Sequence, residues 1–324
     1  MRRIILGIII PLLSFTWQTV VAQQWALPKV SVAILRATPR HTAEQVSQVV
    51  MGTPLKVVET NGEWWLVNTP DNYEGYIRRN SLTGLDNNEM ATWKQSSRAI
   101  LYSDKTEFVT IEPTTRPDAT RLTDLVAGSI VEILSAGVND IDADNNSEES
   151  VGQLSLIKLP DGREGYIKTS LLRPLKQWAS LEWMPKEMPK YANRLIGTPY
   201  VWGGTSTKGM DCSGLTQICA YRYGVLLPRD ASKQAKCGIA LKKGDFSKFQ
   251  AGDLLFFGDV RKGKVTHVAI SLGKDKYIHS SGMVRVSSLD SSSPIYENAG
   301  LLFVRRIDHK TAEKLSVKNH SWYF

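Results

Sequence analysis

The sequence predicts a multidomain chain in which two small β-barrels precede a larger α+β domain. Three observations support this prediction. A turn-and-strand motif occurs twice in the first half of the chain, and short strands of alternating polarity surround each copy. A different pattern, in which a helix precedes a pair of strands, begins near Trp183. The length of 324 residues is sufficient for two or three such domains.

The composition is globular and excludes several classes of protein. Apolar residues make up 42% of the chain, and 40 basic residues against 32 acidic ones give a net charge of +8. The basic residues are scattered, which argues against nucleic acid as a partner. Three cysteines are too few for a disulfide-stapled scaffold. Neither His-Glu-x-x-His nor paired Cys-x-x-Cys occurs, so we expect no metal and no cofactor.

The first 22 residues have the pattern of a signal peptide. The chain starts Met-Arg-Arg, continues with an apolar run over residues 4–15 and reaches small residues at 20–22. Pro11 and Gln18 shorten the run below the roughly 20 apolar residues that a membrane-spanning helix needs. We therefore expect cleavage, export to a periplasm or out of the cell, and no stable membrane anchor.

Residues 70–77 and 160–167 are copies of one motif. The sequences Pro-Asp-Asn-Tyr-Glu-Gly-Tyr-Ile and Pro-Asp-Gly-Arg-Glu-Gly-Tyr-Ile agree at six of eight positions. Their separation is too long for a solenoid repeat, so two copies of one small domain are predicted. The strands expected around them cover residues 55–58, 64–67, 130–133 and 154–157. This pattern resembles the bacterial SH3-like domain that accompanies cell-wall hydrolases, where it binds wall polymers or shapes a neighbouring active site.

Two segments resemble ligand-binding loops but lack an essential residue. Residues 140–151 begin like a calcium loop, yet Asn145 replaces its glycine and Val151 its bidentate carboxylate. Residues 258–264 match most of a phosphate loop, but Val265 replaces the required Ser or Thr. We predict an acidic hairpin insertion for the first segment and a hairpin turn for the second.

Cys212 lies in the first turn of a predicted helix. Residues 211–214, Asp-Cys-Ser-Gly, open a segment with apolar residues at helical spacing that ends at Gly224. The free N–H groups and positive dipole of a helix N-terminus stabilise a thiolate. Cys212 is therefore a candidate nucleophile, although a structural thiol fits the same pattern. For Cys219 and Cys237 we predict that structural role.

A nucleophilic thiol needs a base within reach, and the base must be oriented by a third group. Residues 265–270 predict a strand that carries His267, and residues 276–280 predict a second strand that carries His279. An antiparallel pair would place the two imidazoles side by side. The other three histidines are expected in a loop before the first barrel or in a polar tail: His41, His309 and His320.

Six short motifs in the last third of the chain resemble those of one family. They are residues 200–204 (Tyr-Val-Trp-Gly-Gly), 211–214, 227–230 (Leu-Pro-Arg-Asp), 252–257, 266–268 and 277–279. Together they resemble the NlpC family of papain-like cell-wall cysteine peptidases over about residues 185–308. With the preceding SH3-like domains, the chain is similar in particular to exported γ-D-glutamyl-L-diamino-acid endopeptidases. The resemblance implies a papain-like α+β domain and peptidoglycan-derived peptides as substrates, with either lysine or diaminopimelate as the diamino acid.

The resemblance also implies roles for single residues. Cys212 would be the nucleophile, His267 the general base and then acid, and His279 the polar group that orients His267. Tyr200 would direct its hydroxyl toward the oxyanion. Three residues beside the nucleophile would contact substrate: Asp211, Ser213 and Trp202. Asp211 is equally suited to cap the helix.

In relatives of this architecture, the first SH3-like domain packs on the peptidase and a carboxylate cluster receives the free amine of an N-terminal L-Ala. Asp230 matches the residue that the peptidase contributes, and Tyr73 matches the tyrosine of the first SH3-like domain. The second copy has Arg163 in place of Tyr73, which favours a role for one copy only. Glu44 is the candidate second carboxylate, with an ordinary surface glutamate as the alternative.

These features divide the chain into five expected parts. They are a signal peptide (1–22), a first SH3-like domain (23–90), a second SH3-like domain (91–176), a peptidase domain (177–308) that opens with a helix over 190–196, and a C-terminal tail (309–324). Two other functions stay open at this point: an amidase or acyltransferase on the same fold, and a non-catalytic wall-binding protein. The sequence does not predict an oligomeric state.

Overall fold

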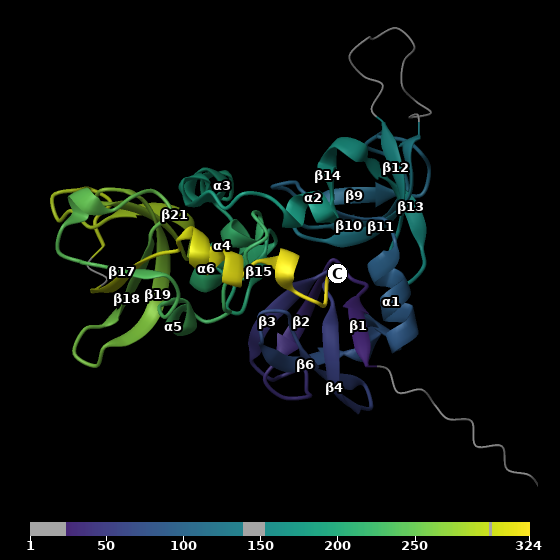
Figure 1. Ribbon diagram of the computed structural model, residues 1–324, viewed down its shortest axis with the longest axis horizontal. Coiled ribbons are helices and arrows are strands. Elements are labelled where there is room, and N and C mark those ends of the chain that lie inside the picture. The colour runs from purple at the N-terminus through teal and green to yellow at the C-terminus, as the bar shows by residue number, and fades with distance from the viewer. Residues whose placement is uncertain (1–23, 139–152, 298–299) are drawn as a thin grey trace, which may run out of the picture.

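The computed structural model describes residues 24–138, 153–297 and 300–324, so the expected signal peptide and the loop resembling a calcium site lie outside the described residues. Two β-domains lie side by side, and a larger α+β domain packs against them (Figure 1). Among the described residues, no helix is long and apolar enough to cross a membrane.

The first β-domain is a seven-stranded antiparallel sheet. Its strands, in the spatial order β3-β2-β6-β5-β4-β1-β7, are β1 (Trp25–Pro28), β2 (Val32–Arg36), β3 (Gln45–Val50), β4 (Leu55–Asn61), β5 (Trp64–Asn68), β6 (Glu74–Arg78) and β7 (Leu82–Leu85), with the short 3-10 helix η1 (Arg79–Ser81) before β7. Alternate side chains point inward. Leu35, Val67 and Ile77 form part of the buried core. The strands expected at 55–58 and 64–67 are confirmed.

The second β-domain repeats this topology strand for strand. Its order is β10-β9-β13-β12-β11-β8-β14, which is the first order with every number raised by seven. The strands are β8 (Arg98–Leu101), β9 (Glu107–Thr110), β10 (Arg121–Leu125), β11 (Ile130–Val138), β12 (Leu154–Lys158), β13 (Glu164–Lys168) and β14 (Leu172–Pro174), with η2 (Thr169–Leu171) before β14. The two copies of the motif thus form the same turn and strand in each domain.

The turn inside the motif explains one of its two sequence differences. Asn72 and Gly162 occupy the same position, and both have left-handed backbone conformations, with φ of 57° and 87°. Glycine and asparagine are the residues that adopt this conformation most easily. The exchange of Asn for Gly therefore preserves the turn.

The expected closure into barrels is not seen in the described residues. Strands β3 and β7, at the two edges of the first sheet, do not pair with each other, nor do β10 and β14 in the second. In the first domain, β3 instead contacts β15 (Thr205–Ser206) of the α+β domain. An edge strand leaves polar backbone groups unpaired, and docking against another domain is one way to satisfy them.

Short helices connect the domains. Helix α1 (Asn87–Gln95) joins the two β-domains and begins with a capping box formed by Asp86 and Glu89. The boundary expected between residues 90 and 91 falls inside this helix. Helix α2 (Leu175–Ala179) leaves the second β-domain and buries Trp178, whose ring packs on Tyr221.

The α+β domain places helices against one six-stranded antiparallel sheet, as predicted. The sheet has the order β17-β22-β18-β19-β20-β21. Its strands are β17 (Ile239–Leu241), β18 (Leu254–Asp259), β19 (Lys264–Gly273), β20 (Lys276–Ser281), β21 (Met283–Ser288) and β22 (Leu301–Arg306). The helical elements are η3 (Pro185–Glu187), α3 (Met188–Arg194), α4 (Cys212–Tyr221), α5 (Ala231–Gln234) and η4 (Phe246–Lys248), and β15 pairs with β16 (Gly209–Met210).

The core of this domain lies between helices α3 and α4 and strands β19 and β20. Leu215 of α4 is fully buried with Ile270 and Ile278 of the sheet. The segment that resembles a phosphate loop joins β18 to β19, which confirms the predicted hairpin. Helix α3 begins two residues earlier than the expected 190–196.

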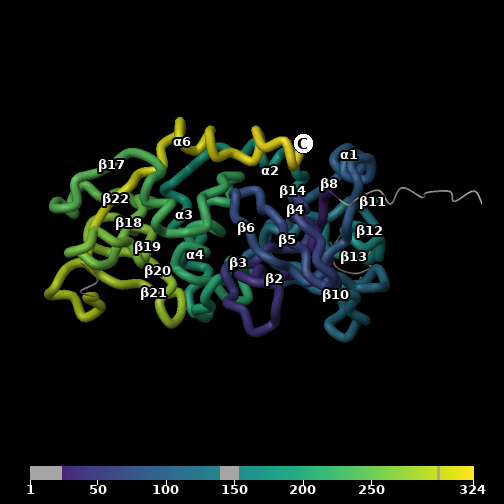
Figure 2. The backbone as a smooth tube through the Cα atoms, turned by 90° about the horizontal axis from the view of Figure 1, so that it is seen from below, coloured from purple at the N-terminus to yellow at the C-terminus, as the bar shows by residue number. Residues whose placement is uncertain are grey.

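The C-terminal segment differs from the polar tail that was expected. It contains α6 (His309–Lys314) and η5 (Val317–Asn319), and it runs from the α+β domain to the junction of the β-domains (Figures 1 and 2). Tyr323 is 1% exposed and shares a buried cluster with Leu27 and Trp178. The aromatic side chains at the end of the chain thus extend the core between the domains.

Candidate active site

Cys212 is the first residue of α4, as the sequence predicts. Asp211 precedes it in an extended conformation, and its carboxylate accepts a hydrogen bond from the Gly214 N–H at 2.8 Å, so it is the N-cap. The thiol is close to the backbone N–H groups of Ser213 and Val268. Cys212 is 7% exposed. The helix thus presents its thiol toward strand β19, beside the residue that follows His267.

The first turn of α4 packs tightly on the preceding loop. The N–H of Asp211 donates to the Gly204 carbonyl at 3.1 Å. A Cβ atom on Gly214 would lie 2.0 Å from that same carbonyl oxygen, well inside van der Waals contact. Glycine at position 214 therefore allows the helix to start this close to the loop.

The close contact leads to a stability prediction. Gly214→Ala should destabilise the fold by about 1–3 kcal/mol, because the backbone of the loop must move to admit the methyl group. The matched control is Gly244→Ala, where a Cβ would meet nothing within 4 Å, and it should change stability by less than about 0.5 kcal/mol. Chemical denaturation of both variants measures this difference. Equal stability of the two variants would contradict the packing described here.

Burial controls the charge of the thiol and of the imidazole. Burial, followed by the negative charge of Asp211, raises the pKa of Cys212, although the N–H groups of Val268 and Ser213 oppose this shift. Burial lowers the pKa of His267. Both directions favour a neutral thiol beside a neutral imidazole. The expected stabilisation of a thiolate by the helix N-terminus is therefore outweighed in the free protein.

The two strand histidines meet as the predicted pairing requires. Strands β19 and β20 are antiparallel, with Ile270 opposite Ile278. The Nε2 atom of His267 lies 2.7 Å from Nδ1 of His279, and the rings are nearly perpendicular. This contact leaves Nδ1 of His267 available to a second partner.

The far side of His279 contacts residues that the motifs did not indicate. Its Nε2 atom lies 3.0 Å from Oγ of Ser287 and 3.1 Å from Oε2 of Glu297. Arg285 forms an ion pair with Glu297. Strand β21 pairs with β20 so that Arg285 is opposite His279. A hairpin between β20 and β21 is the one sequence signal that could have predicted residues 285–287 beside His279. No sequence signal predicts that Glu297 lies there.

Tyr200 lies near Cys212. Burial, followed by the nearby Cys212 and Asp211, raises the pKa of Tyr200 to about 12. Its hydroxyl therefore keeps its proton at neutral pH and can donate a hydrogen bond. The backbone N–H of Tyr200 donates to the Gly282 carbonyl at 2.9 Å, which ties this loop to the turn between β20 and β21.

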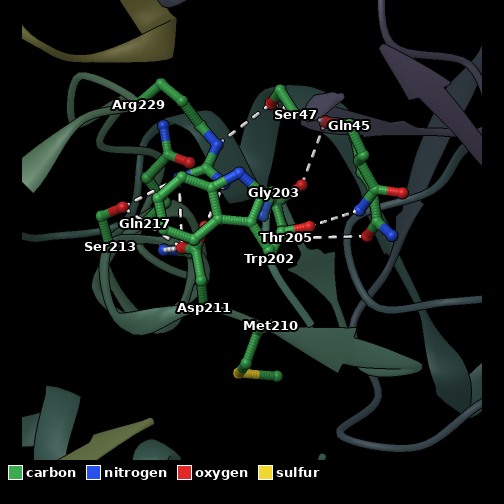
Figure 3. A network of polar contacts seen from close by, with 12 residues as sticks. Gln45, Ser47, Trp202, Gly203, Thr205, Met210, Asp211, Ser213, Gln217 and Arg229 are labelled. Carbon is green, nitrogen blue, oxygen red and sulfur yellow. Dashed lines mark hydrogen bonds and ion pairs between the residues drawn. The ribbon is translucent and has the colours of Figure 1, made fainter. Parts of the chain in front are cut away.

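Asp211 and Ser213, two expected substrate contacts, belong to a buried network (Figure 3). The side chain of Arg229 is 3% exposed and forms an ion pair with Asp211. Its guanidinium also donates to Oγ of Ser213 at 2.8 Å and to Oγ of Ser47 in the first β-domain at 3.1 Å. The second carboxylate oxygen of Asp211 accepts from the N–H of Gly203 at 3.0 Å. Both side chains are thus engaged inside the protein, and Arg229 ties them to β3.

Further contacts fix the first β-domain to the loop before α4. Gln45 donates to the carbonyl of Trp202 at 2.8 Å, and Trp202 donates from its indole N–H to Glu44 at 2.8 Å. Thr205 donates from its backbone N–H to Oε1 of Gln48 at 3.1 Å. A Cβ on Gly203 would lie 2.7 Å from the Gln45 carbonyl oxygen, so this surface requires glycine. Trp202 itself is 61% exposed, with its ring directed away from the core.

The candidate amine-binding residues lie around this same junction. Burial, followed by the negative charge of Asp230, raises the pKa of the Tyr73 hydroxyl, and Asp71 and Glu44 act on it in the same direction. The hydroxyl is thus close to carboxylates from both domains. Lys233 lies 3.1 Å from Asp230 and 5.2 Å from the centre of the Tyr73 ring. Sequence reasoning did not indicate Asp71 or Lys233.

The remaining cysteines and histidines take other positions. Cys219 is fully buried in the core, as predicted, whereas Cys237, which follows α5, is half-buried. His41 lies between β2 and β3, inside the first β-domain, where its ring packs on Trp64. The ring of His320 contacts the carbonyl of Pro70. In the described ranges, no group of three or more His, Cys, Asp or Glu side chains is arranged to hold a metal ion.

A thiol at the start of a helix that packs on the two strands carrying an imidazole pair is the arrangement of a papain-like cysteine peptidase. Comparison with known proteins agrees. A model of the NlpC/P60 family matches residues 197–304, and a model of the bacterial SH3 domain matches residues 31–83. Dipeptidyl-peptidase 6 of Lysinibacillus sphaericus is 31% identical over 271 residues, which cover 82% of this chain and 92% of that protein.

Two further relatives extend the match. A γ-D-glutamyl-L-lysine dipeptidyl-peptidase of Bacillus cereus is 27% identical over 271 residues, covering 78% of this chain and 73% of that protein. The crystal structure of an NlpC/P60 family protein from Bacillus cereus covers 87% of this chain and 99% of that chain, with a TM-score of 0.70 at 22% identity, and so shares the fold. The chain belongs to the NlpC/P60 family and is a cysteine peptidase with bacterial SH3-like domains.

Proposed function

We propose that this peptidase hydrolyses the γ-D-glutamyl-L-diamino-acid bond of peptidoglycan stem peptides, and that it prefers turnover fragments with a free N-terminal L-Ala. The observation that carries the proposal is the packing of α4, which begins with Cys212, on the strands that carry His267 and His279. The junction with the first β-domain, where Asp230, Asp71 and Glu44 act on the Tyr73 hydroxyl, supports the substrate preference. Relatives named as γ-D-glutamyl-L-lysine dipeptidyl-peptidases support the bond and the length of the product. Export by the segment over residues 1–22 is part of the same proposal, because the wall lies outside the membrane.

The chemistry begins with a neutral thiol. Cys212 attacks the γ-carbonyl carbon of D-Glu while Nδ1 of His267 accepts the thiol proton. The oxyanion accepts hydrogen bonds from the Cys212 backbone N–H and from the Tyr200 hydroxyl. Collapse of the tetrahedral intermediate breaks the C–N bond, and His267 returns the proton to the amine of the departing diamino acid. Water, deprotonated by His267, then hydrolyses the thioester and restores the thiol.

The specificity in this proposal comes from the domain junction. An ammonium group at the N-terminus of the substrate would meet Asp230, Glu44 and the Tyr73 hydroxyl, with Trp202 as the wall of the cleft. Trp202 is held by Glu44 through its indole N–H, so the wall and the carboxylate are fixed together. The Lys233 ammonium already neutralises part of the charge of Asp230. A cationic substrate must therefore share that carboxylate with Lys233, whereas a neutral amide offers nothing in exchange for desolvating it.

The free amine should dominate substrate choice. Acetylation of the N-terminal alanine of an L-Ala-γ-D-Glu-diamino-acid peptide should lower kcat/KM by roughly 30-fold to several thousand-fold. The Asp230 side chain is 39% exposed in the free protein, and once the substrate covers it, the lack of a cationic partner costs about 2–5 kcal/mol. Steady-state hydrolysis of the free and acetylated peptides measures the ratio.

A pair of variants assigns the effect to the junction. Asp230→Asn should reduce the ratio between the two peptides more than it reduces hydrolysis of the acetylated one. Asp161→Asn is the control, since Asp161 is also paired with a neighbouring cation, Arg163, but lies in the second β-domain. Equal rates on free and acetylated peptides would exclude the amine site and leave the first β-domain as a packing or wall-binding domain.

A further inference from the structure

We propose that Glu297 is a positioning residue that fixes the tautomer of His279 and, through it, the tautomer of His267. Glu297 belongs to none of the sequence motifs, and it follows strand β21 in a connecting segment. The inference rests on the proposed function in one respect, namely the use of His267 as the base. It goes beyond that function by naming what gives the base its reactive form.

Nε2 of His279 faces two oxygen atoms. Oε2 of Glu297 lies 3.1 Å away and Oγ of Ser287 lies 3.0 Å away. A carboxylate can only accept hydrogen bonds. The Ser287 hydroxyl can either donate or accept in its contact with Nε2. The charged partner of Nε2 is therefore an obligatory acceptor, and the hydroxyl adapts to it.

The nitrogen that faces the carboxylate carries the proton, because that contact is a hydrogen bond only when Nε2 donates. Burial, followed by the adjacent His267, lowers the pKa of His279 to about 4, so the imidazole is neutral near pH 7 and carries one proton. With that proton on Nε2, Nδ1 has a free lone pair.

The tautomer of His279 in turn determines the tautomer of His267. Nδ1 of His279 lies 2.7 Å from Nε2 of His267. Because Nδ1 can only accept, Nε2 of His267 must donate and therefore holds the proton of that ring. The lone pair of His267 is then on Nδ1, the nitrogen that accepts the thiol proton in the proposed mechanism. In the opposite tautomer, Nδ1 would be protonated and unable to accept a proton from the thiol.

Glu297 is itself firmly held. Arg285 forms an ion pair with its other oxygen, Oε1, and the Tyr277 hydroxyl donates to Oε2 at 3.4 Å. Although partial burial alone would raise the pKa of Glu297, His279 and Arg285 lower it, so the carboxylate is ionised at neutral pH. The carboxylate of Glu297 is therefore held by side chains from both strand β20 and strand β21.

The charges around His267 and His279 determine in which direction the pKa of His267 should change when Glu297 is neutralised. The negative charge of Glu297 raises the pKa of His267, the charge of Asp211 acts in the same direction, and Arg285 opposes both. When the negative charge of Glu297 is removed, less negative charge remains to offset the effect of the Arg285 cation on His267. The pKa of His267 should then fall, and the acidic limb of the activity profile should move to lower pH.

Nuclear magnetic resonance of the full chain with nitrogen-15-labelled histidine tests the tautomers without any substrate. In the wild-type protein, His279 should carry its proton on Nε2 and His267 on Nε2 as well. Glu297→Gln should produce a mixture, because the amide can donate to His279 as well as accept from it. A wild-type spectrum with the proton of His279 on Nδ1 would overturn the inference, whether or not the variant folds.

The kinetic test is alkylation of the thiol by iodoacetamide, followed by mass spectrometry of the Cys212 peptide as a function of pH. Glu297→Gln should move the acidic limb to lower pH and slow alkylation about 10- to 100-fold, by analogy with the outer partners of metal-binding histidines. Glu297→Asp should restore the position of the limb. Glu132→Gln, which removes the same charge from an ion pair with Lys158 in the second β-domain, should change neither.

Alkylation and tautomers are measured without peptide, so failure of the proposed substrate leaves them unaffected. Where the peptide is cleaved, Glu297→Gln should lower kcat by the same factor with little change in KM. A Glu297→Gln protein that is folded but has an unchanged limb and unchanged tautomers would reduce Glu297 to a structural ion-pair partner of Arg285 and refute the proposal.

Discussion

Cys212→Ala is expected to abolish peptide hydrolysis while leaving the fold and substrate binding intact. The proposed nucleophile is lost, and removal of the nucleophile of a comparable triad costs on the order of 10⁶-fold in kcat. Alanine is the best helix former, and Asp211 still caps α4, so the helix start should persist. Chromatography of the products measures turnover, and calorimetric titration measures binding to the inactive variant.

The half-buried Cys237 provides the control for this experiment. It lies after α5 and outside the site, so Cys237→Ala should retain normal turnover. Near-normal hydrolysis by Cys212→Ala would contradict a thiol mechanism. Binding of an unreacted peptide by the same variant would show that the loss concerns chemistry rather than the cleft.

His267→Ala should be almost as damaging, with a loss of roughly 10⁴-fold or more in kcat. Because burial raises the pKa of Cys212, the thiol depends on His267 to remove its proton, and the leaving amine depends on the same imidazole to receive one. Added imidazole should restore part of the rate if it enters the space that the side chain leaves. Hydrolysis is followed by product chromatography with and without imidazole.

His309→Ala is the matched control for the base, since His309 lies at the start of α6. That variant should keep its activity. A His267→Ala enzyme with more than a tenth of the wild-type kcat would exclude His267 as the base and require another group to deprotonate Cys212.

Local patterns predicted much of this molecule. The repeated turn, with Asn72 or Gly162 in a left-handed conformation, predicted two copies of one domain, and both sheets have the same strand order. The Asp-Cys-Ser-Gly motif predicted that Cys212 would start a helix. The strands that carry His267 and His279 are separated by one tight turn, so their pairing followed from short-range rules.

The features that sequence reasoning missed depend on distant contacts. Arg229 joins Asp211 to Ser47, which lies in another domain, and neither spacing nor periodicity indicates such a contact. Glu297 reaches His279 from a connecting segment. Tyr323 looked like part of a polar tail because the surface that covers it comes from other parts of the chain. The sheets were expected to close, but β3 docks on the peptidase domain instead.

The charge state of the thiol also depends on groups around the helix start. A helix N-terminus favours a thiolate in isolation. Around Cys212, burial and the carboxylate of Asp211 act against it, and the carboxylate is present because it caps the helix. The residue that starts the helix thus also disfavours early ionisation, which makes the proton acceptor His267 essential to the proposed mechanism.

Hydrolysis of an L-Ala-γ-D-Glu-L-diamino-acid peptide in oxygen-18-labelled water tests the central claim most directly. Mass spectrometry should find the free diamino acid without label and the dipeptide L-Ala-D-Glu with one labelled oxygen in its γ-carboxylate. Formation of this pair should be absent with Cys212→Ala. Label at another carboxylate or release of free alanine would contradict the assignment of the bond. Failure of folded wild-type protein to cleave the peptide would contradict it as well.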